Sequence, residues 1–274
     1  MIKKPRNAIE ACKSVLLEVM LLLGTYRKSL ILIGGNVPPL LCPEVENQYI
    51  GTFDIDILMD QKSIDDDSYN KIENLLLNKG YKKHELRPNT YRREVTHSDG
   101  SITVVLVDFL ASPYGGTGES HRHQQIQDIK ARKLQGADFV LRNFTIARIE
   151  GTLPDGGHDA VEVRIADTVS FIILKGLALS ERLKEKDSYD IYFCIKYYPG
   201  GIDSLVEQFM PMLNDNLVKK ALNAIAAKFQ SINHVGPLHA AQLSLPSSDE
   251  ELQMIKRDSF EHVNALLKKL GIIF

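Results

Sequence analysis

The sequence predicts a mixed α/β fold, with a β-sheet flanked by helices followed by a helical C-terminal half. Two observations predict this class. Up to residue 165, short apolar runs bounded by glycine, proline and polar residues alternate with helical patterns, which is typical of strands and helices that share one core. From Asp167 onward the apolar residues follow helical spacing. We therefore expect two domains, which comprise residues 1–165 and residues 166–274.

The composition is that of a globular protein, with 44% hydrophobic and 25% charged residues among 274. The formal net charge of -2 gives no global attraction to nucleic acid, so any such contact depends on a local basic patch. Three distant cysteines without a C-x-x-C pair disfavour a disulfide framework or a zinc site. The same cysteine pattern favours a reducing cytoplasm, and no membrane contact is expected because no apolar run is long enough to span a bilayer.

The elements of the first part follow from apolar spacing and turn residues. The chain begins with an amphipathic helix that ends at Gly24, and its charged interruptions argue against a signal peptide. The strongest hairpin signal is Ser98-Asp99-Gly100. We expect a helical turn and loop at 36–48 and a polar, mobile loop at 111–125. Strands are expected at 29–35, 52–59, 90–97, 101–110, 144–151 and 160–166, and a further helix at 65–80.

The second part is expected to contain only helices. The last of them begins after Ser248, which forms a plausible capping box with Glu251. The others are expected at 168–186, 187–198, 202–213 and 217–229.

Two acids lie in the strand TFDIDILM. Asp54 and Asp56 are two positions apart, so their side chains point to the same side of the strand. Two adjacent carboxylates repel each other unless a cation lies between them, and oxygen ligands suit Mg²⁺. An acidic pair on an exposed strand explains this motif alone equally well.

The context of the pair favours a metal site. Gly34 and Gly35 end the preceding strand, where backbone amides can bind phosphate. Asp108 follows an apolar run in TVVLVDFL, where a carboxylate needs a partner. Three acids on neighbouring strands beside a glycine turn are the arrangement expected for two-metal phosphoryl or nucleotidyl transfer.

The helical half supplies a second group of charged residues. Lys175 interrupts the apolar helix FIILKGLAL, and Asp187 and Asp190 follow one helical turn apart. The alternative is that Lys175 extends to the surface and Asp187 is a helix N-cap.

In their order along the chain, these motifs resemble the AbiEii/AbiGii toxin family of the DNA-polymerase-β-like nucleotidyltransferase superfamily. The resemblance spans residues 31 to 193, and its most specific part is the block Lys186, Asp187 and Asp190 after the Lys175 helix. It implies a nucleotidyltransferase-type sheet, transfer of NMP from an NTP such as ATP, GTP or CTP to a tRNA or other RNA end, and a cognate antitoxin. The helical half is then expected to complete the active-site cleft.

The resemblance also implies a role for each motif residue. Asp54 and Asp56 bind two Mg²⁺ ions, with Mn²⁺ as an alternative, and Asp108 binds one of them and orients or deprotonates the acceptor hydroxyl. Asp187 positions Lys175 or the acceptor. The nucleotide is expected to contact Gly34, Gly35, Asn36, Thr52 and Lys175.

The chain also departs from the family pattern. Asn36 follows the glycine pair, Ile50 replaces an arginine, 37–48 is longer, and 111–160 looks like an insertion. Two rival functions stay open: a small-molecule nucleotidyltransferase of the aminoglycoside type, and a catalytically silent module that retains the fold. His121-Arg122-His123 is read either as a metal or acceptor cluster or as a solvated loop.

Overall fold

The computed structural model describes residues 6–60, 66–111, 123–126 and 129–272. The chain forms two compact units. One is a sheet unit of residues 4–37 and 51–166, and the other is a helical unit of residues 1–3, 38–50 and 167–274. Residues 38–50 therefore belong with the helices, although the sequence analysis placed them within 1–165.

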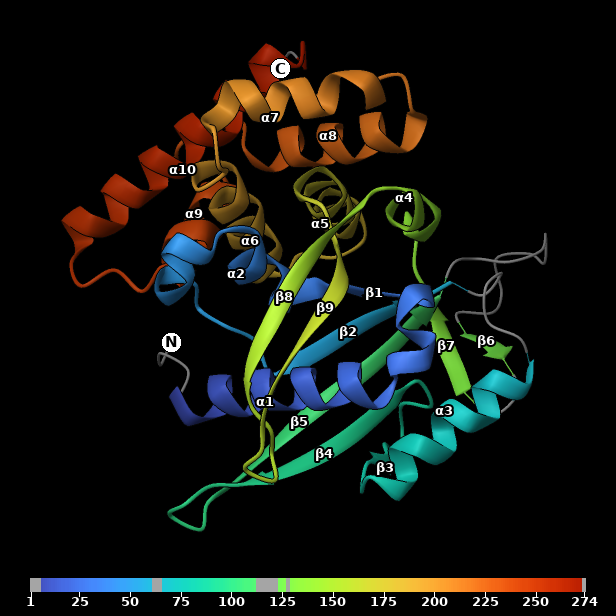
Figure 1. The fold of residues 1–274 in the computed structure, drawn as a ribbon. Helices are drawn as coiled ribbons and strands as arrows, with labels where there is room; N and C mark the ends of the chain where they lie inside the picture. The colour runs from blue at the N-terminus through green and yellow to red at the C-terminus, as the bar shows by residue number, and fades with distance from the viewer. Residues whose placement is uncertain (1–5, 61–65, 112–122, 127–128, 273–274) are drawn as a thin grey trace. The chain divides into compact units, whose positions relative to one another are not determined.

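The sheet unit is built on a mixed β-sheet (Figure 1). Its main path runs β3-β4-β5-β2-β1-β9-β8, and β7 pairs with β5 and with β6. β2 and β5 are parallel, whereas β1 and β2 are antiparallel. The strands are β1 (Leu30–Ile33), β2 (Asp54–Met59), β3 (Lys82–Lys83), β4 (Thr90–Thr96), β5 (Ile102–Ala111), β6 (His123–Ile126), β7 (Ile129–Lys133), β8 (Phe144–Thr152) and β9 (His158–Ala166).

One face of this sheet packs against α1 (Arg6–Leu22). The guanidinium of Arg93 bonds Glu18 of this helix with Nε–Oε1 at 2.8 Å, and Arg93 pairs with Val105 across β4 and β5. This face also carries the fully buried side chains of Ile55 and Val107. The opposite face carries the alternate residues of the same strands, so Asp54, Asp56 and Asp108 all lie on it. The other helices of the sheet unit are α3 (Asp66–Asn78) and α4 (Ala137–Arg142).

The helical unit contains most of α2 (Val37–Leu41) and six longer helices. α5 and α8 approach closely, because a Cβ atom on Gly176 would lie only 2.7 Å from the carbonyl oxygen of Ala221. Ser248 caps the last helix by accepting from the amide of Glu251 at 3.2 Å. The six helices are α5 (Thr168–Glu181), α6 (Glu185–Lys196), α7 (Gly201–Phe209), α8 (Asn216–Lys228), α9 (Val235–Leu243) and α10 (Asp249–Lys269).

These features confirm the predicted fold class, a mixed sheet flanked by helices followed by a helical C-terminal half. Three predictions need correction. The helix expected at 168–186 ends at Glu181 because Arg182 is extended. Residues 43–48 form a 3₁₀ helix rather than a loop. Strands β3, β6 and β7 and helices α4 and α9 were not predicted.

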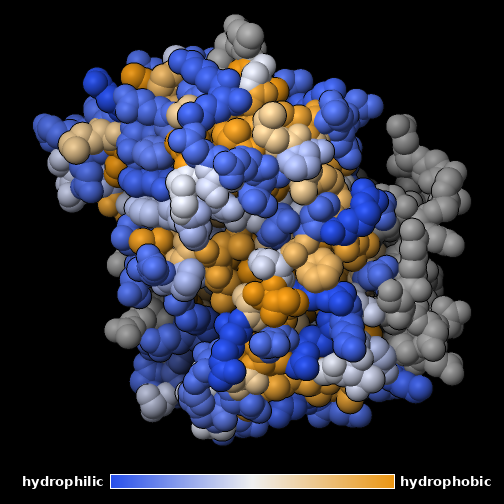
Figure 2. All heavy atoms as spheres, turned by 45° about the horizontal axis from the view of Figure 1, so that its top comes forward, coloured by the Kyte–Doolittle hydropathy of each residue, from blue (hydrophilic) through white to orange (hydrophobic). Residues whose placement is uncertain are grey.

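The described residues include no helix long and apolar enough to cross a membrane. Blue, hydrophilic residues cover much of the face seen in Figure 2, with apolar residues between them. Most of the predicted loop at 111–125 lies outside the described residues.

Candidate functional site

The three acids of the sheet unit are held together by strand register. β2 and β5 run parallel with Asp56 opposite Asp108 and Asp54 opposite Leu106. Residues paired in this way project from the same face of a sheet, and Asp54 is two residues from Asp56. The structure therefore places Asp54, Asp56 and Asp108 on one face of two adjacent strands.

Gly34 lies directly against the Asp56 carboxylate. It follows β1, whose last residue Ile33 pairs with Asp56. A Cβ atom on Gly34 would lie 1.9 Å from Oδ2 of Asp56, and the glycine has a φ of +73° that other residues rarely adopt. Only glycine at this position lets the turn and the carboxylate come so close.

Asn36 connects the glycine turn to the acid strand. Gly35 and Asn36 are buried in this turn. Asn36 Nδ2 donates to the carbonyl oxygen of Asp54 at 2.8 Å, and its Oδ1 accepts from the Cys12 thiol at 3.6 Å. Asn36 is therefore tied to the start of β2, which is a structural role compatible with the nucleotide contact predicted for it.

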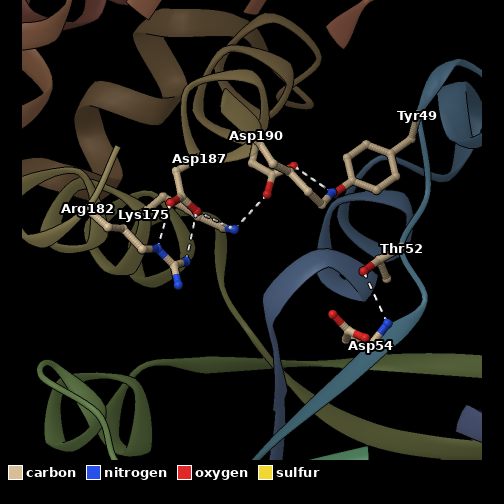
Figure 3. Close-up of polar contacts among 8 residues, drawn as sticks. Tyr49, Thr52, Asp54, Lys175, Arg182, Asp187 and Asp190 are labelled. Carbon is tan, nitrogen blue, oxygen red and sulfur yellow. Dashed lines mark hydrogen bonds and ion pairs between the residues drawn. The ribbon is translucent and has the colours of Figure 1, made fainter. Parts of the chain in front are cut away.

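Two threonines hold backbone and carboxylate groups of the acids. The hydroxyl of Thr52 accepts from the amide of Asp54 at 3.4 Å (Figure 3). The hydroxyl of Thr90 donates to Oδ1 of Asp108. Sequence reasoning missed Thr90, although the hairpin register could have found it, because a turn that pairs His97 with Ser101 also pairs Thr90 with Asp108.

Lys175 belongs to the helical unit, where it forms an ion-paired cluster with Asp187 and Asp190. Its Nζ lies 3.0 Å from Oδ1 of Asp187 and 2.7 Å from Oδ2 of Asp190. Arg182 holds Asp187 from the other side through Nε–Oδ2 at 3.0 Å and Nη2–Oδ1 at 3.3 Å. Figure 3 shows Lys175 between the two carboxylates and Arg182 facing Asp187.

A second set of contacts binds the other carboxylate oxygen of Asp190, Oδ1. The hydroxyl of Tyr49 donates to Oδ1 of Asp190 at 2.7 Å and accepts from Nζ of Lys186 at 2.5 Å. Lys186 also pairs with Oδ1 of Asp190 at 3.2 Å. Asp190 is thus fully buried with a cation on each oxygen, and the segment 38–50 is attached to α6 through Tyr49.

The burial and the charges of this cluster oppose each other. Burial alone lowers the pKa of Lys175, but Asp190 and Asp187 outweigh it and raise that pKa above its ordinary value. Burial alone raises the pKa of Asp190, but Lys175 and Lys186 outweigh it and leave that pKa below its ordinary value. Both groups are therefore held in their charged forms.

Both alternatives for these residues are wrong. The Lys175 side chain is 12% exposed, so it does not extend to the surface. The N-cap of α6 is Lys184, and the Asp187 carboxylate is used by Lys175 and Arg182. The two aspartates are sufficient to neutralise the buried ammonium of Lys175. The predicted contact of Lys175 with a triphosphate is therefore not needed to explain its burial, and it stays a prediction.

The metal site also stays a prediction. Within the described part of the chain, no group of three or more His, Cys, Asp or Glu side chains is gathered as a metal centre in this structure. His121 and Arg122 lie outside the described residues, and only the backbone of His123 is described. Within the sheet unit the acids and the glycine turn share one strand register, and the Lys175 cluster lies within the helical unit.

A scan against models of protein families and a search of curated proteins give no match to this chain.

Proposed function

We propose that the chain is a metal-dependent nucleotidyltransferase that transfers NMP from an NTP to an RNA acceptor such as a tRNA end. The observation that carries the proposal is the pairing of Asp56 with Asp108 on parallel strands, with Gly34 against the Asp56 carboxylate. Adjacent carboxylates beside a glycine turn are suited to a metal-bound polyphosphate.

The donor set fits magnesium. Asp54, Asp56 and Asp108 offer carboxylate oxygens from one sheet face, and Mg²⁺ and Mn²⁺ both take oxygen ligands. Asp54 and Asp56 would hold both ions and Asp108 one of them. When bound, the metal ions neutralise charge on the transferring phosphoryl group.

The proposed step is an in-line displacement. The acceptor hydroxyl oxygen forms a bond to the α-phosphorus, the bond from that phosphorus to the bridging oxygen of the β-phosphate breaks, and pyrophosphate leaves. Asp108 takes the hydroxyl proton at its carboxylate. The hydroxyl of Thr90, which donates to Oδ1 of Asp108, orients this carboxylate.

The remaining motif residues bind and orient the nucleotide. The backbone amides of Gly34, Gly35 and Asn36 are proposed to bind the triphosphate, and Thr52 is proposed to border it. Lys175 is proposed to bind the same triphosphate on the basis of its motif alone, with Asp187 fixing its ammonium at 3.0 Å.

A labelling experiment tests this function. The protein is incubated with Mg²⁺, total tRNA and each α-³²P-labelled NTP in turn, with EDTA or an aminoglycoside mixture in parallel arms. We expect label to be transferred to tRNA, and we expect EDTA to abolish this transfer. Asp108→Asn should lower the rate by about 10²–10³-fold, whereas Asp99→Asn in the exposed hairpin turn should not. Labelled aminoglycoside alone would support the small-molecule rival, and no labelling by folded protein would reject the proposal.

A toxin role is proposed from the resemblance, together with an antitoxin partner. Induced expression of the chain should then arrest bacterial growth. Asp56→Ala should abolish that arrest at equal protein level. Growth arrest that persists with Asp56→Ala would show that toxicity does not depend on the three acids of the sheet unit.

A further inference from the structure

An arginine that the motifs do not include lies on the same sheet face as the acids. Thr90 of β4 pairs with Asp108, and Arg92, two residues further on, pairs with Leu106 of β5. Leu106 in turn pairs with Asp54 of β2. Because residues two apart share a face, Arg92 projects from the face that carries Asp54, Asp56 and Asp108.

The backbone of Arg92 pairs with β3 and β5, whereas its side-chain Nε is buried and unpaired among the described residues. Its neighbour Arg93, on the opposite face, is instead bound by both carboxylate oxygens of Glu18. Asp108 is a diagonal neighbour of Arg92 and within reach of a long side chain, yet its Oδ1 accepts from Thr90 instead. A buried guanidinium donor without a partner is unfavourable unless a ligand supplies the acceptor.

The sheet order indicates which substrate would reach Arg92. The order β4-β5-β2-β1 places the acids of β5 and β2 between the glycine turn after β1 and Arg92 on β4. In an in-line displacement the attacking oxygen and the leaving pyrophosphate lie on opposite sides of the α-phosphorus. If the glycine turn binds the leaving phosphates, as the proposed function holds, the acceptor approaches from the β4 side.

We infer that Arg92 binds a backbone phosphate of the RNA acceptor, next to the hydroxyl that attacks the NTP. A guanidinium suits this role because it binds phosphate oxygens in a bidentate manner. The surface beside it is open, since Ile102 and Val104 on the adjacent strand are 61% and 45% exposed. This inference rests on the proposed function and adds the side from which the acceptor enters. A polycationic aminoglycoside would be repelled at this position.

The test measures binding and transfer separately. Binding of fluorescein-labelled tRNA is followed by anisotropy over a series of salt concentrations for the full chain, Arg92→Gln, Arg92→Lys and a control, Arg148→Gln. Arg148 lies on β8 and is already paired with Glu150 at 3.0 Å. We expect Arg92→Gln to reduce the slope of log K against log salt by about 1. Arg92→Lys should keep the slope, because the charge remains, and Arg148→Gln should leave it unchanged.

The affinity for NTP shows whether Arg92 binds a phosphate of the RNA acceptor or the triphosphate of the NTP. Arg92→Gln should bind a fluorescent NTP analogue as tightly as the parent, while its KM for tRNA in the transfer reaction rises. A weaker NTP affinity with an unchanged tRNA slope would assign Arg92 to the triphosphate and overturn the inference. If Arg92→Gln does not fold, Arg92→Lys takes its place: a higher KM for tRNA with unchanged NTP affinity supports the inference, because the bidentate guanidinium contact is lost, and an unchanged KM for tRNA overturns it.

The proposed function and the Arg92 inference can fail independently. If the parent binds tRNA with an Arg92-dependent slope but transfers no nucleotide, the reaction is wrong and the phosphate contact stands. If the parent transfers nucleotide and Arg92→Gln does so with the same KM for tRNA and the same slope, the Arg92 inference alone is rejected.

Discussion

Gly34 and Asp56 are in such close contact that a single added methyl group at Gly34 would lie 1.9 Å from a carboxylate oxygen of Asp56. Asp56 lies on β2, Gly34 directly follows the neighbouring antiparallel strand β1, and the glycine also has a φ of +73°. This contact fixes the position of the Asp56 carboxylate relative to the turn that is proposed to bind phosphate. A larger residue at Gly34 would therefore displace the Asp56 carboxylate without changing its charge.

Gly34→Ala should impair Mg²⁺ binding and transfer more than it impairs folding. The added Cβ forces the Asp56 side chain to rotate, and the positive φ costs about 1–2 kcal/mol. Gly100→Ala is the matched control, because Gly100 has a φ of +79° with nothing within 4 Å of an added Cβ. Thermal melts should show a loss in Gly34→Ala at least as large as that in Gly100→Ala, because Asp56 must also move, and Mg²⁺ titration should show a defect in Gly34→Ala alone. Equal Mg²⁺ affinity in the two variants would contradict the role given to Asp56.

Asp56→Ala should abolish transfer without unfolding the protein. In the presence of chelator the variant should melt at or above the parent temperature, because Asp56 and Asp108 are like charges in register and their repulsion is removed. Adding Mg²⁺ at about a hundredfold over its Kd should stabilise the parent by about 2.7 kcal/mol and the variant by much less. A large loss of stability in chelator would show that Asp56 has a structural role instead.

Tyr49→Phe should destabilise the helical unit by about 1.5–3 kcal/mol, the range for hydrogen bonds to charged groups. The variant removes the donor to Asp190 and the acceptor for Lys186. It keeps the ring that packs edge-on against Phe193 with centroids 5.1 Å apart. The measurement is urea denaturation monitored by circular dichroism.

Tyr197→Phe is the control for that change. The Tyr197 hydroxyl donates to Oε1 of Gln48 at 2.6 Å, which is an exposed contact between neutral groups. Its loss should cost about 1 kcal/mol or less. If the two variants lose equal stability, the Tyr49 hydroxyl does not support Asp190 in the way that the structure indicates.

The sequence was sufficient to predict most regular elements, because their apolar spacing is a local property. β4 and β5 follow from alternation and from the Ser98-Asp99-Gly100 turn, and the structure has them at Thr90–Thr96 and Ile102–Ala111. α9 was missed because it is apolar almost all round and has Gly236 and Pro237 in its first turn, so it has no amphipathic pattern. Gly236 fits there because a Cβ atom would lie 2.5 Å from the carbonyl oxygen of Lys228.

The candidate site was predictable only where its residues follow local spacing. Asp54 and Asp56 are two residues apart on a strand, and Asp187 and Asp190 are three apart on a helix, so each pair was expected to share a side. Tyr49 could not be found in this way, because it is 141 residues from its partner Asp190. Arg92 was missed because its position beside the acids depends on two successive strand registers.

Lys175→Met should destabilise the protein by about 3–5 kcal/mol near neutral pH, because it removes the cation on Oδ2 of the buried Asp190 and leaves only Lys186 paired with this carboxylate. Lys196→Met should cost less, since Lys196 and its partner Asp258 are 30% and 34% exposed. Urea denaturation of both variants measures the difference. Equal losses would contradict a buried ion pair at Lys175.

The cost of Lys175→Met should depend on pH in a predictable direction. The pKa of Asp190 in the folded protein is below its ordinary value of about 3.9, so the stability it contributes is present above pH ~4 and is lost as pH falls through the folded pKa. The pKa of Lys175 is above its ordinary value of about 10.4, so its contribution is complete below that pH and is lost as pH rises through the folded pKa. The difference in unfolding free energy between parent and variant should therefore be constant from about pH 5 to 9 and should narrow in acid, because Asp190 then becomes protonated. A difference that stays constant below about pH 4 would mean that the Lys175–Asp190 pair does not set the pKa of Asp190.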